Sequence, residues 1–414
     1  MMSCGKEVRI PSNWAKLEKE VLMEEPDEDL IAMDELIDWV IECEVGDEDF
    51  ARNYVKKVKP YNFLRCLYPV LPNNYLCRAM FKTFLHFLIA VYRIDDVMEK
   101  NCTKDDMLKI CNAYNMLDGQ LCDTFPELPC INEIKHSLDY LGNRKLVSPV
   151  TMLMDFVNKV ISLLLKHGNV SEDDVFEFRR RLSNTMSIYL QAAVSEKRMT
   201  AKDTENETLW RRIFGGGPLF LLMFVEISSF SVGKVKKHMP AITEMYVISS
   251  LCCIITNDVY SYHRETNDGL TECDSVIKLW LHKKEVSSVP EAVGKITRIL
   301  NAIFTYMYEK VEKIKVKYPN SPELHRLLDY IAYATTGWIF IHDQASPRYE
   351  DSPWRLSLSD VEENELEGWL IKKDVYGWYV VQQYLEMPNT KAKTFIDALR
   401  GVITVRGQFT ETLC

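Results

Sequence analysis

The amino-acid sequence predicts an all-α fold, on three observations. Glycine and proline are sparse, sixteen of each in 414 residues, and most of them stand at the ends of long segments with helical periodicity. The chain is 47% hydrophobic and 11% aromatic, which is typical of a folded protein with a large core. No run of β-branched residues alternates over several strands, so we expect little or no sheet; only the aromatic stretch Val375–Val381 favours an extended conformation.

Helical periodicity between capping residues predicts ten helices. Thr103 and Ser171 each stand shortly before a pair of aspartates, and carboxylates stabilise a helix start because they accept from its free N–H groups and meet the positive end of its dipole. Four further helices are expected to begin at a proline. In chain order, the expected helices are Asp29–Glu44, Asn74–Glu99, Lys104–Thr124, Pro149–Lys166, Ser171–Ser195, Glu205–Phe214, Pro218–Val232, Ala241–His263, Pro290–Val316 and Pro322–His342.

The domain organisation follows from the absence of a linker. A chain of 414 residues has room for two or three domains, but no composition shift, repeat or low-complexity tract divides it. We therefore expect one main helical bundle over residues 61–350. Residues 1–60 are expected to be a helical extension packed on that bundle, and residues 351–414 a second extension that covers or flanks the active-site end.

Charge and cysteine usage restrict the class of protein. Sixty acidic residues against fifty basic ones give a net charge of −10, so a nucleic acid is not an expected partner, and an anionic substrate would need local cations or metal ions. The twelve cysteines show no zinc-binding spacing and are expected to be free thiols in a reducing cytosol.

No signal peptide is expected, and the apolar runs fall short of the ~20 residues that a transmembrane helix needs. The sequence thus favours a soluble, cytoplasmic protein.

Two acidic motifs lie late in predicted helices, where the helix dipole disfavours negative charge. Asp95 and Asp96 follow a long apolar stretch, and Glu99 lies four and three residues further on, so the three carboxylates can converge on one face. Such a face offers hard oxygen ligands to a divalent cation. A solvated helix end is the alternative for this motif taken alone.

The second motif, Asn257-Asp258-Val259-Tyr260-Ser261-Tyr262-His263-Arg264-Glu265, follows the apolar run Val247–Thr256. Asn257, Ser261 and Glu265 are spaced four residues apart, which stacks an amide, a hydroxyl and a carboxylate along one ridge of a helix. Because amide and hydroxyl oxygens are weak ligands, this ridge would hold Mg²⁺ well only with substrate phosphates completing the shell.

Together, the two motifs resemble the metal-binding signature of class I terpene synthases, of the short single-domain kind known from microbes and octocorals. The resemblance implies an α-helical bundle around a central apolar cavity. It also implies that Asp95, Asp96 and Glu99 on one helix, and Asn257, Ser261 and Glu265 on another, hold a cluster of three Mg²⁺ ions, for which Mn²⁺ can substitute.

The resemblance extends to a helix break upstream of the second motif. In that family, an arginine that senses the substrate diphosphate lies forty-six residues before the asparagine, which is the position of Arg211. The family's linker residue and its effector, whose backbone carbonyl faces the substrate, then correspond to Phe214 and Gly215. Three glycines and Pro218 break the helix there, and no Lys-Ser/Thr pair follows, which excludes a nucleotide-binding P-loop.

Three further residues match diphosphate contacts of the family. Arg348 and Tyr349 correspond to an Arg-Tyr pair that binds diphosphate when the site closes, and Arg264 stands where microbial members have a lysine. Glu99 departs from the usual third aspartate, and Phe214 is apolar where a polar linker is common. The resemblance covers roughly residues 60–350.

The resemblance implies a terpene cyclase, a carbon–oxygen lyase that ionises a linear prenyl diphosphate, releases diphosphate and cyclises the resulting cation to a hydrocarbon or alcohol. Geranylgeranyl diphosphate is favoured as the substrate because octocoral relatives often make diterpenes, with farnesyl diphosphate as the alternative. Aromatic faces stabilise carbocations, by about 0.5–2 kcal/mol each. Candidate lining residues, each with packing in the core as its alternative, are Phe87, Tyr92, Phe220, Phe224 and Trp338.

Other functions remain open. A chain-elongating prenyl transferase of the same fold normally has two Asp-rich motifs, and the motif at Asn257 argues against it. A non-catalytic helical binding protein is the other alternative, and a homodimer is possible by family analogy alone. His342 and Asp343 resemble a metal phosphohydrolase pair, but without partner histidines we interpret them as a helix-end pair.

Overall fold

A computed structural model describes residues 7–23, 33–43, 48–67, 75–100, 102–123, 125–196, 212, 225–227, 229, 231–267 and 275–361. This part of the chain is mostly α-helical, as the sequence predicts. Its main helices are α1 (Ser12–Met23), α3 (Met33–Glu42), α4 (Glu48–Val58), α5 (Pro60–Leu67), α6 (Tyr75–Lys100), α7 (Lys104–Asp123), α8 (Ile131–Ser137), α9 (Arg144–His167), α10 (Glu172–Glu196), α13 (Met239–Asn267), α14 (Val276–His282), α15 (Val289–Lys317) and α16 (Pro322–Phe340).

The helix starts show which capping signals in the sequence were reliable. The backbone N–H of Asp106 donates to Thr103 Oγ1 (3.2 Å), and the N–H of Asp174 donates to Ser171 Oγ (3.2 Å), so the predicted starts of α7 and α10 are confirmed. The predicted start of α9 at Pro149 is wrong. The helix begins at Arg144, because the Asn143 side chain accepts from a first-turn N–H, and the proline lies inside it.

Several predictions differ from the structure in extent or lie outside its described part. Helices α1, α4, α5, α8 and α14 were not predicted; the longest of the five, α1, has 12 residues. The stretch Val375–Val381 and all of the predicted helix Glu205–Phe214 except Arg212 lie outside the described residues. Of the predicted helix Pro218–Val232, the structure describes residues 225–227, which are helical, and residues 229, 231 and 232, which are not, so the predicted end of this helix is wrong.

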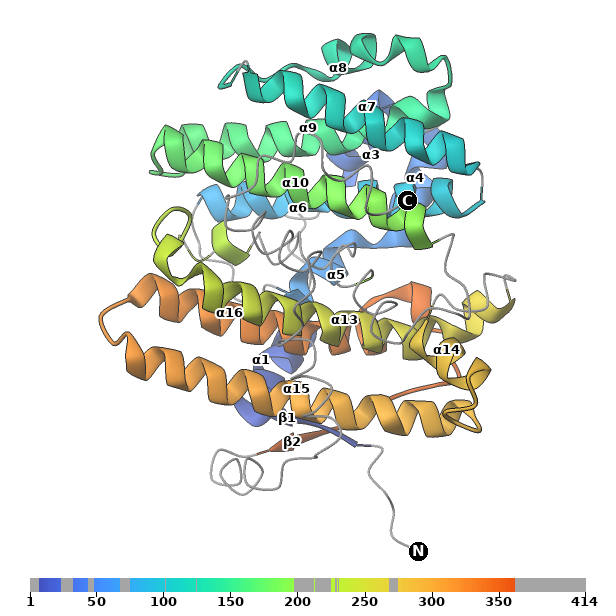
Figure 1. The fold of residues 1–414 in the computed structure, drawn as a ribbon, viewed down its shortest axis with the longest axis vertical. Helices are drawn as coiled ribbons and strands as arrows, with labels where there is room; N and C mark the ends of the chain where they lie inside the picture. The colour runs from blue at the N-terminus through green and yellow to red at the C-terminus, as the bar shows by residue number, and fades with distance from the viewer. Residues whose placement is uncertain are drawn as a thin grey trace, which may run out of the picture.

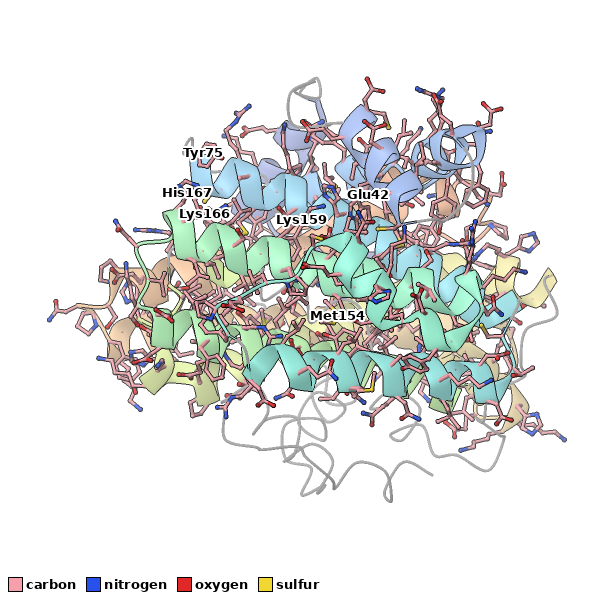
Figure 2. The ribbon with its side chains drawn as sticks, turned by 90° about the horizontal axis from the view of Figure 1, so that it is seen from above. Glu42, Tyr75, Met154, Lys159, Lys166 and His167 are labelled. Atoms are coloured by element: carbon pink, nitrogen blue, oxygen red, sulfur yellow. The ribbon has the colours of Figure 1, made fainter. Side chains whose placement is uncertain are left out.

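The helices form two layers that share one apolar core (Figure 1). One layer contains α6, α7, α9 and α10, and the other contains α13, α15 and α16. Helix α5 contacts both α6 and α16, and its Leu64 is fully buried, so it joins the layers. Within the first layer, Figure 2 shows Tyr75 at the start of α6 beside His167 at the end of α9, which makes these helices antiparallel. The arrangement places the late parts of α6 and α13 in different layers.

A two-stranded parallel sheet joins the ends of the described chain. Strand β1 (Glu7–Pro11) pairs with β2 (Ser357–Val361), with Glu7 opposite Ser357. Asn301 of α15 holds β1 as a further strand would: its Oδ1 accepts from the N–H of Arg9 (2.7 Å) and its Nδ2 donates to the carbonyl of Glu7 (3.0 Å). Within the described ranges these are the only two strands, so the expectation of little or no sheet is confirmed, although the sequence did not reveal this pairing.

Three helices are long and apolar enough to cross a membrane, by length and composition alone. They span Tyr75–Ile94, Arg144–His167 and Lys236–Thr266, so the expectation that no segment reaches this length is wrong. Between 67% and 83% of each apolar window is buried inside the fold. Packing on both sides of these central helices accounts for their hydropathy.

Each of the eight cysteines whose side chains the structure describes is free. They are Cys43, Cys66, Cys77, Cys102, Cys111, Cys130, Cys252 and Cys253. Burial raises the pKa of the Cys111 thiol to about 12, which keeps it protonated. These residues agree with the expectation of free thiols.

Candidate active site

The predicted ligand ridge on α13 is present in the structure. Asn257 and Ser261 lie one turn apart, and the Ser261 hydroxyl donates to Asn257 Oδ1 over 3.3 Å. Glu265 lies one turn further on, near the end of the helix. Because residues four apart lie on the same face of an α-helix, this spacing brings an amide oxygen and a hydroxyl oxygen together.

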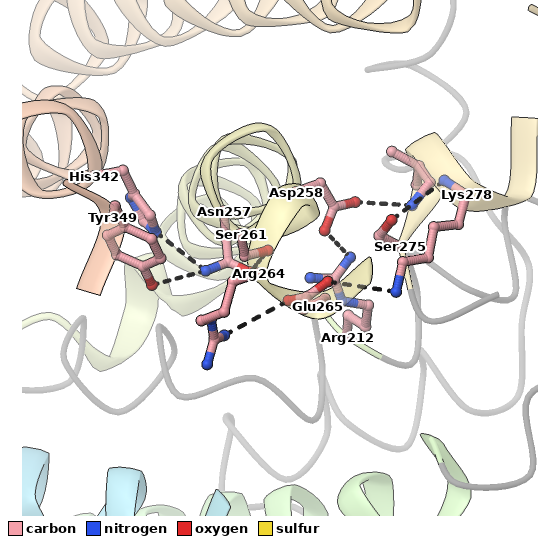
Figure 3. Close-up of polar contacts among 11 residues, drawn as sticks. Arg212, Asn257, Asp258, Ser261, Arg264, Glu265, Ser275, Lys278, His342 and Tyr349 are labelled. Carbon is pink, nitrogen blue, oxygen red and sulfur yellow. Dashed lines mark hydrogen bonds and ion pairs between the residues drawn. The ribbon is translucent and has the colours of Figure 1, made fainter. Parts of the chain in front are cut away.

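The amide nitrogen of Asn257 has two partners from the segment after α16 (Figure 3). Asn257 Nδ2 donates to the Tyr349 hydroxyl over 2.9 Å and lies 3.4 Å from His342 Nε2. Tyr349, predicted as a diphosphate contact, thus meets the predicted metal ligand directly. His342 lies in a π-helical turn, Ile341–Ala345, and is buried.

Sequence reasoning missed the contact of His342 with Asn257. Its position at a helix end is as expected, but its side chain points at Asn257 and not at solvent. His342 Nδ1 lies 2.6 Å from the carbonyl oxygen of Trp338. Burial lowers the pKa of His342 to about 4, so the ring is neutral at pH 7. The signal that could have found it is the proximity of the residue to Arg348 and Tyr349 in the sequence.

Asp258, beside the ridge, is fully buried and points away from Asn257. It pairs with the guanidinium of Arg212 and accepts the backbone N–H of Val276 at the start of α14 (2.8 Å). Burial raises the pKa of Asp258 to about 6, and the Arg212 charge opposes this rise. Arg212, not predicted as a site residue, therefore pairs with α13, while Arg211 lies outside the described residues.

Glu265 faces two cations at the edge of ion-pair range. Its Oε1 lies 3.9 Å from Arg264 Nη2, and its Oε2 lies 4.0 Å from Lys278 Nζ of α14. In Figure 3 the guanidinium of Arg264 extends from α13 on the side of Asn257, and Lys278 approaches Glu265 from the side of Asp258. These cations form a positive rim around the ridge, and Lys278 is a member that the sequence did not reveal.

A second polar cluster ties the segment carrying Tyr349 to α13. The hydroxyl of Tyr260 donates to Asp343 Oδ1 (2.8 Å), and the backbone N–H of Leu356 donates to the same hydroxyl oxygen (3.3 Å). Arg355 donates to the carbonyl oxygen of Asp343 (2.7 Å) and to that of Glu350 (3.0 Å). Residues on both sides of Tyr349 are therefore held against the helix that carries Asn257.

The first acidic motif lies in the last turns of α6, as predicted. The side chains of Asp95 and Glu99 are outside the described part. Asp96 accepts a hydrogen bond from the Tyr54 hydroxyl of α4 (3.0 Å), so this carboxylate faces α4. The convergence of the three carboxylates on one face stays a prediction.

Several predicted residues fall outside the part of the chain that the structure describes. They are Arg211, Phe214, Gly215, Phe220 and Phe224, together with the side chain of Arg348. The backbone of Arg348 forms part of a short 3₁₀ turn, Pro347–Tyr349.

The described lining candidates differ in their surroundings. Phe87 is fully buried, with its ring centroid 4.9 Å from that of Phe156, which places it in the interface of α6 and α9. Trp338 is also fully buried, and its indole N–H donates to Ser249 of α13 (3.1 Å). Tyr92 is half-buried on α6, one turn before Asp96. Phe87 and Trp338 are thus core residues by packing.

The donor set fits a hard divalent cation that substrate phosphates help to hold. Among the described side chains, no three carboxylate, histidine or cysteine groups gather into a metal site. The α13 ridge instead offers Asn257 Oδ1 and Ser261 Oγ, whose oxygens lie 3.3 Å apart. Glu265 adds a carboxylate without a tight ion pair among the described residues. These are oxygen ligands of the kind that Mg²⁺ accepts.

A sequence profile described as "Terpene synthase family 2, C-terminal metal binding" matches residues 86–306. The match spans more than half of the chain and includes both the acidic motif of α6 and the ridge of α13. The chain belongs to the terpene synthase family. The comparison with curated protein sequences gives no match.

Solved structures show the same fold. The chain is similar to 2-methylisoborneol synthase from Streptomyces coelicolor A3(2), solved with Mg²⁺ and geranyl-S-thiolodiphosphate (TM-score 0.52, 14% identity, 81% of this chain and 96% of that one). It is also similar to isoprene synthase from grey poplar leaves, solved with three Mg²⁺ ions and dimethylallyl-S-thiolodiphosphate (TM-score 0.55, 12% identity, 82% and 57%). A single-residue variant of cucumene synthase is a third (TM-score 0.53, 12% identity, 80% and 96%). The expected fold, the helical bundle of class I terpene synthases, is confirmed.

Proposed function

We propose that this terpene synthase family member is a cyclase that ionises a linear prenyl diphosphate and cyclises the resulting cation, releasing diphosphate. The observation that carries the proposal is the pairing of Asn257 Oδ1 with Ser261 Oγ on α13, inside the region that matches the family's metal-binding profile. Geranylgeranyl diphosphate is the favoured substrate and farnesyl diphosphate the alternative, by analogy with octocoral relatives.

Mg²⁺ would be held by Asp95, Asp96 and Glu99 of α6 and by Asn257, Ser261 and Glu265 of α13. Bound there with diphosphate, three ions would neutralise the charge that develops on the leaving group. The structures of related synthases with Mg²⁺ and thiolodiphosphate analogues support this use of the cation.

The chain's own cations complete the binding of the leaving group. Arg264 extends from α13 beside Asn257, and Lys278 adds a second charge next to Glu265. Arg211, Arg348 and Tyr349 are proposed as further diphosphate contacts, with the Gly215 carbonyl facing the substrate. Fixed positive charge around a departing anion lowers the barrier because it requires no reorganisation of solvent.

The Tyr349 hydroxyl begins the reaction in contact with the amide of Asn257. Since a phenol can donate while it accepts from the amide, its proton remains usable for a diphosphate oxygen. Tyr349 is buried and Arg355 anchors its segment, an arrangement that would help to keep water from this side of the site. Water exclusion matters because a carbocation otherwise ends as an alcohol before it cyclises.

The proposal is tested by diphosphate release and by product analysis. Purified protein is incubated with geranyl, farnesyl or geranylgeranyl diphosphate, with and without Mg²⁺, and extracts are analysed by gas chromatography with mass detection. Cyclic products that require Mg²⁺ support a cyclase. Addition of isopentenyl diphosphate distinguishes a chain-elongating prenyl transferase, which would produce a longer linear diphosphate instead.

Variants connect the activity to the proposed ligands. Asp95→Ala and Asn257→Ala should each lower diphosphate release by orders of magnitude while the circular dichroism spectrum stays unchanged. Asp105→Ala is the matched control, because this exposed aspartate lies in the first turn of α7. Full activity in both ligand variants would reject the assignment.

A further inference from the structure

The amide of Asn257 is useful as a metal ligand in only one of its two orientations. Its oxygen and nitrogen occupy nearly the same volume, but only the oxygen can bind a cation. In the structure the oxygen faces Ser261 and the nitrogen faces Tyr349 and His342. A rotation by half a turn would present the NH₂ group to the cation, so some neighbour must select the orientation.

Two of the three neighbours have no preference. The hydroxyls of Ser261 and Tyr349 can each donate or accept a hydrogen bond, because a hydroxyl proton rotates to suit its partner. Both therefore fit the amide in either orientation. The selection falls to the third neighbour, His342.

The carbonyl of Trp338 decides what His342 can do. A carbonyl oxygen only accepts, and it lies 2.6 Å from His342 Nδ1, so the proton of the neutral ring is on Nδ1. Nε2 then carries a lone pair and faces the amide of Asn257 at 3.4 Å. A lone pair accepts from the NH₂ group and repels the amide oxygen, so one orientation is favoured.

We propose that His342 is a positioning residue that turns the amide oxygen of Asn257 toward the cation site. The assignment rests on the proposed function for the identity of the site, but the orientation itself follows from the hydrogen-bond geometry. A chain of hydrogen bonds runs from the Trp338 carbonyl through the imidazole of His342 to the Asn257 nitrogen, and it leaves the amide oxygen beside Ser261 Oγ.

The ring of His342 is held rigidly enough for this role. It is 2% exposed, and its centroid lies 4.7 Å from that of Tyr349 and 6.1 Å from that of Tyr260. The π-helical turn around it is closed by a hydrogen bond from the N–H of Ser346 to the carbonyl of Ile341 (3.0 Å). Such turns place a side chain at an angle that a regular α-helix does not reach.

The first test reads the ring directly. A long-range ¹H–¹⁵N correlation spectrum of the metal-free, uniformly labelled protein reports which nitrogen of His342 carries the proton, with His342→Gln used to assign the signal. We expect the Nδ1–H form at pH 7.5. A spectrum that shows the Nε2–H form would overturn the proposal.

The second test measures metal binding without turnover. The affinity for Mn²⁺ in the presence of inorganic diphosphate is measured by titration calorimetry and by the electron paramagnetic resonance of free Mn²⁺. His342→Phe removes the acceptor and should weaken binding by ~10–100-fold, the usual effect of losing a residue that orients a metal ligand. His342→Gln places an amide oxygen near the position of Nε2 and should restore most of the affinity.

A double-mutant comparison separates orientation from general damage to the fold. In the Asn257→Asp background either carboxylate oxygen can bind the cation, so His342→Phe should cost no further affinity. An equal loss in both backgrounds would overturn the proposal, as would wild-type Mn²⁺ affinity in His342→Phe. If the wild-type protein binds Mn²⁺ and diphosphate but leaves every prenyl diphosphate intact, the proposed function fails, and the same affinity ratios still decide the role of His342.

Discussion

The ion pair between Arg212 and Asp258 provides the sharpest prediction about stability next to the site. Asp258 is fully buried, so its charge depends on Arg212 and on the Val276 N–H. Arg212→Met removes the cation and keeps most of the aliphatic stem. Breaking a buried pair costs about 3–5 kcal/mol, and because the bond from Val276 remains, we expect about 3 kcal/mol.

The pH dependence of this loss has a definite sign. Burial already raises the pKa of Asp258 to about 6, and without Arg212 the pKa rises further. The native state of the variant then holds a proton that the unfolded chain has released, so its stability falls as the pH rises. The free energy of unfolding, measured with urea at pH 5.5 and at pH 8, should therefore show the larger penalty at pH 8.

Matched variants isolate the pair. The double variant Arg212→Met/Asp258→Asn should recover part of the lost stability, since no charge is left buried alone. Arg211→Ala should lower turnover more than Arg212→Ala when both are measured on folded protein. Wild-type stability of Arg212→Met at both pH values, or a penalty that grows toward acid pH, would refute the reasoning.

Two further predictions concern other buried groups. Glu226 accepts two hydrogen bonds from Arg181, at 2.7 and 2.9 Å, and both residues are buried. Glu226→Gln should lower the free energy of unfolding in urea by about 3 kcal/mol, because the Arg181 charge is then buried without its partner. The double variant Arg181→Met/Glu226→Leu should recover most of that loss. Burial lowers the pKa of His86 to about 3. As the pH falls below about 6.5, the unfolded state therefore binds a proton that the folded state does not, and the free energy of unfolding decreases. Between pH 7 and pH 5 the loss from His86 should be about 2 kcal/mol, and an unchanged pH slope in His86→Gln would contradict it.

The sequence alone determined those features that depend on local geometry. The starts of α7 and α10 follow from capping side chains within one turn, and the contact of Ser261 with Asn257 follows from their spacing along one helix. The long segments of helical apolar periodicity in α6, α13 and α16 were enough to predict an all-α fold. These features require no knowledge of what packs against them.

The tertiary structure decided the rest. The strands β1 and β2 lie about 350 residues apart in the sequence, and each is too short to be recognised by alternation. The spacing places Asp96 among the predicted metal ligands, and only the fold shows that its carboxylate also accepts a hydrogen bond from Tyr54 of α4. Likewise, only the fold shows that Arg212 pairs with Asp258 of the second motif.

The orientation of Asn257 shows this division most clearly. Its identity and its place on the ridge are written in the sequence, but its amide meets His342 and Tyr349 only because the end of α16 lies against α13. Local spacing specifies which groups share a helix face, since the backbone alone fixes that geometry. Which partner each group meets across the fold depends on how the helices pack, and no short stretch of sequence contains that information.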